Sequence, residues 1–120
     1  MSEKIYFFDT YTFFEIIAGN SSYEKFTTVN AITTIFNLAE LNFALKREGK
    51  NFADKLCKEY EQMLVEVTLE DVITAMDLRI KNRKLSIPDA IGYTVAKRNG
   101  AIFLTGDKEF KEMTNVEFVK

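Results

Sequence analysis

The chain has 120 residues, of which 47% are hydrophobic and 28% charged, and its formal net charge at pH 7 is −2. These values are ordinary for a soluble globular protein, and the length allows one hydrophobic core without disulfide or metal staples. A slightly negative chain has no overall attraction to nucleic acid, so any such binding must depend on a local basic patch. We therefore expect a single domain over residues 1–120.

The residue types that are missing narrow the possible chemistry. There is no histidine, which excludes Ser-His and Cys-His catalysis, imidazole general bases and typical zinc sites. The single cysteine, Cys57, cannot form an internal disulfide and fits a reducing compartment. No apolar run is long enough to cross a membrane. These features predict a cytoplasmic protein whose chemistry uses carboxylates, hydroxyls, lysines or a hard metal ion.

Short strands and amphipathic helices are predicted to alternate along the chain. Apolar or β-branched runs predict strands at residues 5–8, 29–32, 64–67, 101–104 and 116–119. Apolar residues at helical spacing predict helices over residues 34–46, 52–63 and 69–80. Pro88 stands where a further helix begins, and Gly100 stands where it ends. This alternation indicates βαβ units, and so an α/β fold with a mainly parallel sheet of four to five strands covered on both faces.

Four acidic residues fall where a ligand site is expected. Asp9 directly follows the first predicted strand, and Asp107 follows the predicted strand at 101–104. Ligand sites of open parallel sheets form outside the carboxyl ends of the strands, near the switch in strand order. Glu40 comes from the predicted helix at 34–46, and Asp89 from the start of the helix that Pro88 opens. We expect these four carboxylates to converge on one site.

Such a cluster favours a hard divalent cation. Carboxylates within about 4–6 Å of one another repel and raise each other's pKa, and a bound cation removes this conflict. Oxygen ligands without histidine favour Mg²⁺ or Mn²⁺ over zinc. A water molecule activated by such an ion can attack a phosphodiester, with one or two ions present.

Each acid also has a purely structural interpretation. Asp9 and Asp107 could cap the helices that follow them. Ser86 and Asp89 match a capping box, with a hydroxyl three residues before a carboxylate. Glu40 could lie on a solvated helix face. It is the joint placement of the four acids that favours a metal site.

Four motifs follow one another along the chain. They are Ile-Tyr-Phe-Phe-Asp-Thr at 5–10, Thr-Thr-Ile-Phe-Asn-Leu-Ala-Glu-Leu at 33–41, Ser-Ile-Pro-Asp-Ala-Ile at 86–91 and Ala-Ile-Phe-Leu-Thr-Gly-Asp-Lys-Glu-Phe at 101–110. In this order and spacing the chain resembles the PIN-domain family, and within it the small VapC-type toxins of prokaryotic toxin–antitoxin pairs. The last motif is similar to the family's Thr-x-Asp-Lys-x-Phe signature and is the most specific of the four.

The resemblance implies a three-layer α/β/α sandwich and Mg²⁺- or Mn²⁺-dependent cleavage of RNA. The same four acids would hold the metal, and Thr105 would orient the site through a hydroxyl hydrogen bond. It also implies a small antitoxin that blocks the pocket, and a homodimer. Tyr11 departs from the family pattern, in which a small polar residue is frequent, and the nearby hydroxyl of Thr12 is the predicted substitute.

Several basic residues could form a rim around the acidic centre. A basic rim positions phosphates by charge. The predicted RNA contacts are Arg79, Arg83, Lys84 and Lys108. The alternative interpretation is a solvated helix end, because cations suit the negative end of a helix dipole.

Two other functions fit parts of the sequence. A catalytically silent PIN domain that acts as a binding or scaffold module would keep the same fold, although retention of all four acids disfavours it. A receiver-type signalling domain matches in length, and Asp9, Thr105 and Lys108 imitate its parts. It requires an acceptor aspartate near mid-chain, however, and Asp54 lies in a helical pattern instead.

Overall fold

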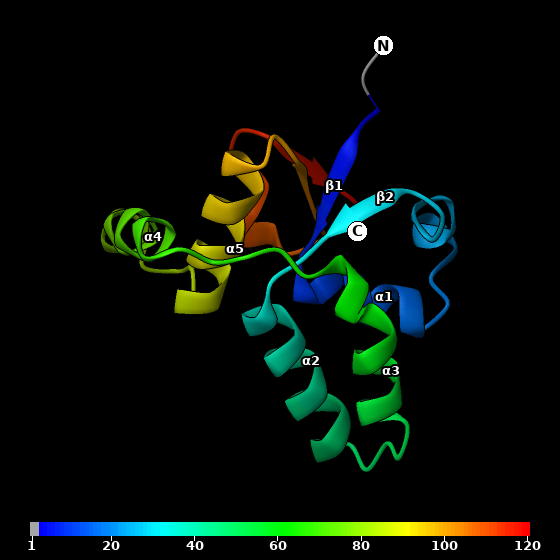
Figure 1. Ribbon diagram of the computed structural model, residues 1–120. Helices are drawn as coiled ribbons and strands as arrows, with labels where there is room; N and C mark the ends of the chain where they lie inside the picture. Colours follow the sequence, from blue (N-terminus) through cyan, green and yellow to red (C-terminus); the bar gives the residue numbers. More distant parts are fainter. Residues whose placement is uncertain (1–2) are drawn as a thin grey trace.

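The computed structural model describes residues 3–120 and contains a four-stranded parallel sheet in the order β2-β1-β3-β4 (Figure 1). The strands are β1 (Ile5–Phe8), β2 (Asn30–Ile32), β3 (Ile102–Thr105) and β4 (Val116–Phe118). Each lies within one residue of a predicted strand at both ends. The predicted α/β fold with a mainly parallel sheet is confirmed, with four strands.

Helices cover both faces of this sheet (Figure 1). One side carries α1 (Thr10–Ile17), α2 (Ile35–Arg47) and α3 (Ala53–Glu59), and the other carries α4 (Leu69–Lys81) and α5 (Ile87–Arg98). Three short 3₁₀ helices, η1, η2 and η3, span Ser21–Phe26, Tyr60–Met63 and Lys108–Phe110. Among residues 3–120, no helix has both the length and the apolar character needed to cross a membrane.

The strands divide the core into two clusters because successive side chains point to opposite faces. Phe7 and Phe103 stack with ring centroids 5.4 Å apart and pack under α5. Phe8 and Leu104 pack against α1 on the other face. Gly92 lets α5 lie close to β1, because a Cβ there would come within 3.2 Å of the Phe7 ring. The middle of α5 therefore lies directly against β1.

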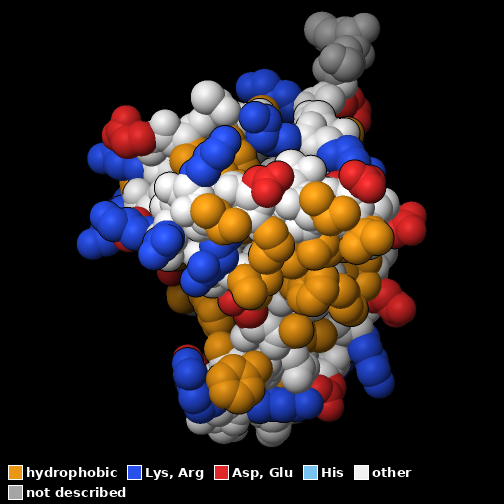
Figure 2. Space-filling model, turned by 90° about the vertical axis from the view of Figure 1, so that its left-hand side faces the viewer, with side chains coloured by type: hydrophobic (Ala, Val, Ile, Leu, Met, Phe, Trp, Pro, Cys, Tyr) orange, Lys and Arg blue, Asp and Glu red, His pale blue; other side chains and the backbone are white. Residues whose placement is uncertain are grey.

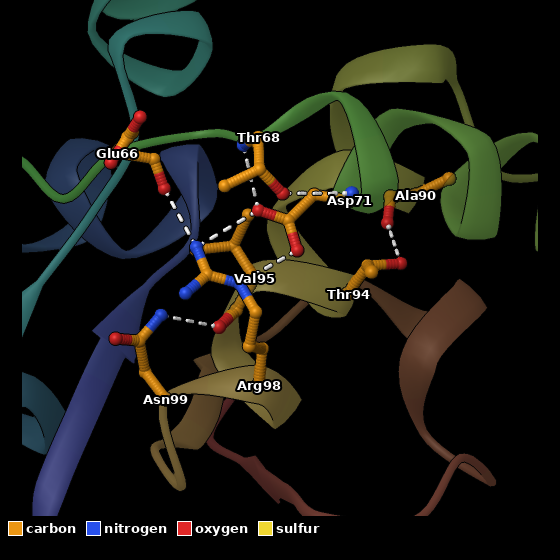
Figure 3. Close-up of polar contacts among 8 residues, drawn as sticks. All are labelled: Glu66, Thr68, Asp71, Ala90, Thr94, Val95, Arg98 and Asn99. Carbon is orange, nitrogen blue, oxygen red and sulfur yellow. Dashed lines mark hydrogen bonds and ion pairs between the residues drawn. The ribbon is translucent and has the colours of Figure 1, made fainter.

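An ion pair fastens α4 to α5 (Figure 3). Arg98 donates from Nε and Nη2 to the two carboxylate oxygens of buried Asp71, at 2.7 and 2.9 Å, and from Nη2 to the Glu66 carbonyl at 2.8 Å. Asp71 also completes a capping box with Thr68 at the start of α4. Bidentate contacts of this kind fix orientation as well as distance. The carboxyl end of α5 is therefore tied to the amino end of α4.

The prediction of a strand at residues 64–67 is wrong. This segment is extended, but it forms only an isolated parallel bridge between Leu64 and Thr33. Thr33 donates to the Met63 carbonyl and accepts from the Val65 amide, both at 3.0 Å. The pairing stops there because α2 begins at Ile35, directly after its extended N-cap residue Thr34. The helical backbone beyond Thr34 offers this segment no further strand pairing.

The apolar spacing from residue 69 to 80 does form a helix, but only part of its apolar surface is buried. Ala75 is fully buried, whereas Leu69, Ile73 and Ile80 are 73%, 50% and 69% exposed. Figure 2 shows a broad apolar area on the side of the molecule that carries α4. We define the α4 patch as Leu69, Ile73 and Ile80 of this helix together with Ile35 and Phe36 at the start of α2, which are 58% and 39% exposed.

Candidate functional site

The candidate site lies at the switch in strand order. After β1 the chain places β2 on one side of it, then crosses to the other side for β3. The connections on the two sides diverge at the carboxyl ends of β1 and β3, which is where open parallel sheets bind ligands. Asp9 is the first residue after β1, and Asp107 is the second after β3. The two residues therefore approach this edge from neighbouring strands.

All four predicted acids line one open pocket at this edge. Its lining residues are Asp9, Thr10, Tyr11, Phe14, Glu40, Phe43, Ala44, Arg47, Asp89 and Asp107. Within residues 3–120, however, no three acidic or cysteine side chains are grouped closely enough to hold a metal ion as they stand. The acids therefore share a pocket without forming a closed ligand shell.

Asp9 lies deepest in this pocket. It is 3% exposed, and the Thr105 hydroxyl donates to its Oδ2 at 2.7 Å. Burial raises its pKa to about 7; the Thr105 bond opposes this rise, and the charges of Asp89 and Asp107 add to it. Asp9 occupies the N-cap position of α1, but its side chain accepts no capping hydrogen bond. The capping interpretation of this residue is therefore wrong.

Glu40 is oriented by a chain of buried polar side chains. The Thr34 hydroxyl donates to Asn37 Oδ1 at 2.7 Å, Asn37 Nδ2 donates to Thr10 Oγ1 at 3.1 Å, and Thr10 donates to Glu40 Oε1 at 2.8 Å. Burial raises the pKa of the half-buried Glu40; the Thr10 bond opposes this, and the charge of Asp89 adds to it. The sequence pattern missed this relay, although an asparagine one turn before Glu40 on α2 was a visible signal.

Asp89 and Asp107 each cap a helix and also line the acidic pocket. Asp89 forms a capping box with Ser86, with hydrogen bonds of 3.0 and 3.1 Å. Asp107 accepts from the Glu109 amide at 3.0 Å and so caps η3. Each of these caps uses one carboxylate oxygen and leaves the other for a ligand. Burial raises the pKa of Asp89, against the Ser86 bonds, and the nearby charges of Asp107 and Glu109 raise it further.

Tyr11, the departure from the family pattern, is matched by Gly106. A Cβ at Gly106 would collide with the Tyr11 ring and with the Val119 carbonyl oxygen. Thr12 does not provide the predicted substitute hydroxyl, because it is fully buried and donates to the Leu104 carbonyl at 2.7 Å. Thr10, at the start of α1, lines the pocket instead.

None of the predicted RNA contacts lines the acidic pocket. Arg79 lies in the last turn of α4, Arg83 and Lys84 follow that helix, and exposed Lys108 follows Asp107. The basic residue that does line the pocket is Arg47 of α2. It shares a helix face with Glu40, seven residues earlier, so helical spacing was the signal that could have identified it.

Comparisons with known proteins agree with this architecture. The family model of the PIN domain matches residues 6–116. The VapC20 toxin of Mycobacterium tuberculosis, described as cleaving the sarcin-ricin loop, is similar with a TM-score of 0.77, 18% identity and 97% of both chains covered. A toxin–antitoxin complex from Klebsiella pneumoniae gives a TM-score of 0.76 and 16% identity, with 93% of this chain and 95% of that chain covered.

The VapBC2 complex of Rickettsia felis, bound to a DNA fragment from its promoter, gives a TM-score of 0.70 at 16% identity, with 96% of this chain and 97% of that chain covered. At such identities these likenesses concern the fold. No curated protein matches the chain. The family match spans both strand ends that carry the acids, Asp9 and Asp107. The chain therefore belongs to the PIN-domain family.

Proposed function

We propose that this protein is a metal-dependent endoribonuclease and the toxin of a toxin–antitoxin pair. The observation that carries the proposal is the buried Asp9 carboxyl, which shares one pocket with three further acids at the strand switch. Burial and the charges of Asp89 and Asp107 oppose its ionisation, and a cation in the pocket would reverse that effect. The donor set is made of hard oxygens, so it fits Mg²⁺ or Mn²⁺.

The proposed metal ligands are Asp9, Glu40, Asp89 and Asp107. When bound, a divalent ion of this kind polarises a phosphodiester and activates a water molecule for attack. The protein's own part is to hold each carboxylate in place. Thr105 holds Asp9, the Thr10 relay holds Glu40, and the helix caps hold Asp89 and Asp107. Groups held in this way need little reorganisation during the reaction.

The proposals that RNA is the substrate and an antitoxin the partner are based on the structural neighbours. One structural neighbour is described as a sarcin-ricin-loop-cleaving toxin, and others were solved as toxin–antitoxin or VapBC complexes. We propose that a small antitoxin covers the acidic pocket of this chain. The lone Cys57 fits a reducing compartment, and we propose that the protein acts in the cytoplasm.

The second candidate function is a catalytically silent PIN domain that acts as a binding module. The absence, within residues 3–120, of any three side chains already grouped around a metal position favours this alternative. Cleavage of mixed RNA in Mn²⁺ separates the two functions. We expect activity in the wild type that is lost in Asp9→Asn and in Asp89→Asn, with Glu24→Gln as an exposed control outside the pocket. Cleavage that survives either aspartate substitution in a folded protein would contradict the proposed site.

We also propose that two copies pair through the α4 patch. The patch borders an apolar groove lined by residues of the 64–68 segment, and monomeric proteins rarely expose apolar areas of this kind. Glu70 and Lys81 flank it at opposite ends of α4. An antiparallel pairing of two α4 helices about a two-fold axis brings Glu70 of one copy to Lys81 of the other, so the surface is self-complementary.

Light scattering tests this pairing. The wild type is expected to have twice the mass of one chain, and Ile73→Glu is expected to halve that mass. Phe52→Glu is the matched control, because Phe52 is 40% exposed and lies outside the patch. A monomeric wild type would rule out the pairing.

A further inference from the structure

One wall of the acidic pocket is formed by an exposed aromatic residue and a cation. Phe43 is 65% exposed, and the guanidinium carbon of Arg47 lies 5.4 Å from the centre of its ring. Both residues line the pocket that contains the four acids. Glu40, Phe43 and Arg47 are three and four residues apart on α2, so one face of this helix carries all three.

Packing does not explain this wall. The buried residues of α2 are Asn37, Leu38, Leu41 and Leu45, and neither core cluster includes Phe43. An exposed phenylalanine gains little from its position in the fold. The guanidinium of Arg47 lies at cation–π distance from this ring. The exposed ring is therefore available beside the proposed metal ligands, next to a cation.

The charges in the pocket indicate which kind of ligand this wall would bind. Four carboxylates repel a phosphate, and Arg47 is the basic residue among those that line the pocket. Proteins that bind unpaired nucleotides combine cations for the phosphates with aromatic rings for the bases. Phe43 and Arg47 present these two groups side by side. A protein segment with an apolar and an acidic side chain would also satisfy both groups, and the binding measurements below distinguish it from RNA.

We propose that Phe43 and Arg47 bind an unpaired nucleotide of the RNA substrate, with its base stacked on Phe43 and an adjacent phosphate held by Arg47. This inference rests on the proposed ribonuclease function. It makes single-stranded or looped RNA the substrate class, because a paired base cannot reach the ring. Phe43 and Arg47 are positioning residues, and the carboxylates remain the proposed metal ligands.

The binding of two RNA probes tests the proposed role of Phe43 and Arg47. Fluorescence anisotropy in Ca²⁺ compares a short mixed-sequence RNA strand with an abasic strand of the same length. Base–aromatic stacking of ordinary strength makes the wild type prefer the RNA strand by about fivefold to a hundredfold. Phe43→Ala is expected to lose this preference, and Phe43→Tyr to keep it. Arg47→Gln is expected to weaken the binding of both strands, because both carry the phosphate.

Two controls distinguish nucleotide binding by Phe43 from a structural role of this residue. Phe52→Ala removes another exposed phenylalanine, outside the pocket, and is expected to retain the full preference. Phe43→Ala is expected to leave the melting temperature unchanged. In cleavage assays it should raise KM by the same factor as it weakens binding while leaving kcat nearly unchanged, as loss of uniform binding does.

Several outcomes would overturn the proposal that Phe43 and Arg47 bind a nucleotide. They are a wild type that binds neither strand, one that binds both strands equally, and a Phe43→Ala variant that keeps the preference for bases. If that variant instead loses affinity only for a co-encoded antitoxin, the wall is a protein-binding surface and the inference is wrong. A preference for bases without any metal-dependent cleavage would refute the nuclease function, while nucleotide binding by Phe43 and Arg47 would still hold.

Discussion

Asp9→Asn is expected to stabilise the metal-free protein at high pH, although it removes the proposed activity. Asp9 is 3% exposed, and burial raises its pKa from 3.8 to about 7. A carboxyl group with a raised pKa in the folded state stabilises the fold fully below its unfolded pKa. It loses that contribution as the pH rises through the folded pKa. The wild type should therefore become less stable between pH 4 and pH 8.

The size of this effect follows from the two pKa values. A pKa difference of one corresponds to about 1.4 kcal/mol, so the loss for Asp9 amounts to at most about 4 kcal/mol. Between pH 5 and pH 8 the same relation gives about 2–3 kcal/mol. The asparagine side chain does not ionise, and its amide oxygen can still accept the bond from Thr105. The variant should avoid this loss without losing the hydrogen bond.

Urea unfolding in EDTA at pH 5 and pH 8 measures the effect. The free energy of unfolding of Asp9→Asn relative to the wild type should rise by about 2–3 kcal/mol between the two pH values. The exposed control Glu24→Gln should stay within about 0.5 kcal/mol at both. Added Mn²⁺ should stabilise the wild type and not the variant, because only the native metal site binds the ion. An equal pH dependence for wild type and variant would refute the reasoning about the buried carboxyl.

Three further substitutions test the supports of the site. Thr105→Val removes the donor to Asp9, so unfolding free energy should fall by about 1–3 kcal/mol, and by more at pH 8 than at pH 5, in urea titrations. Gly106→Ala introduces the collisions described above and should lower the free energy of unfolding by more than about 1 kcal/mol while weakening stabilisation by Mn²⁺. Arg98→Ala should lower the melting temperature at pH 7 and by less below pH 4, because Arg98 holds the pKa of Asp71 below its ordinary value. An Arg98→Ala effect that stays constant across this range would contradict the ion-pair explanation.

Local patterns were sufficient for the strands and for the acids that end them. β1 and β3 are compact apolar runs, and the residues that follow a parallel strand lie at the carboxyl edge whatever the rest of the chain does. The segment at 64–67 has the same composition, but a strand also needs a partner with extended backbone. The start of α2 at Ile35 removes that partner. Such a requirement depends on the neighbouring element and cannot be found within the segment itself.

Contacts between distant segments were the part that the sequence did not reveal. The bond between Asn37 and Thr10 joins residues 27 apart, and nothing local to either residue predicts it. The basic residues after α4 were assigned to RNA because they precede Asp89 in the chain, yet Arg47 is the cation that lines the pocket. Order along the chain is a poor guide to such neighbours. Helical spacing from Glu40 would have been a better one.

The four acids affect the fold in different ways, and this difference follows from where the chain places them. Asp89 and Asp107 accept hydrogen bonds from backbone amides at the starts of α5 and η3, so their side chains support the fold even without a ligand. Asp9 accepts no capping hydrogen bond, and burial raises its pKa to about 7. A cation in the pocket would therefore favour the ionised form of Asp9, which the metal-free fold disfavours. The pocket thus combines two acids that cap helices, Glu40, which Thr10 holds, and Asp9, whose ionised form burial disfavours. Packing alone does not require this arrangement.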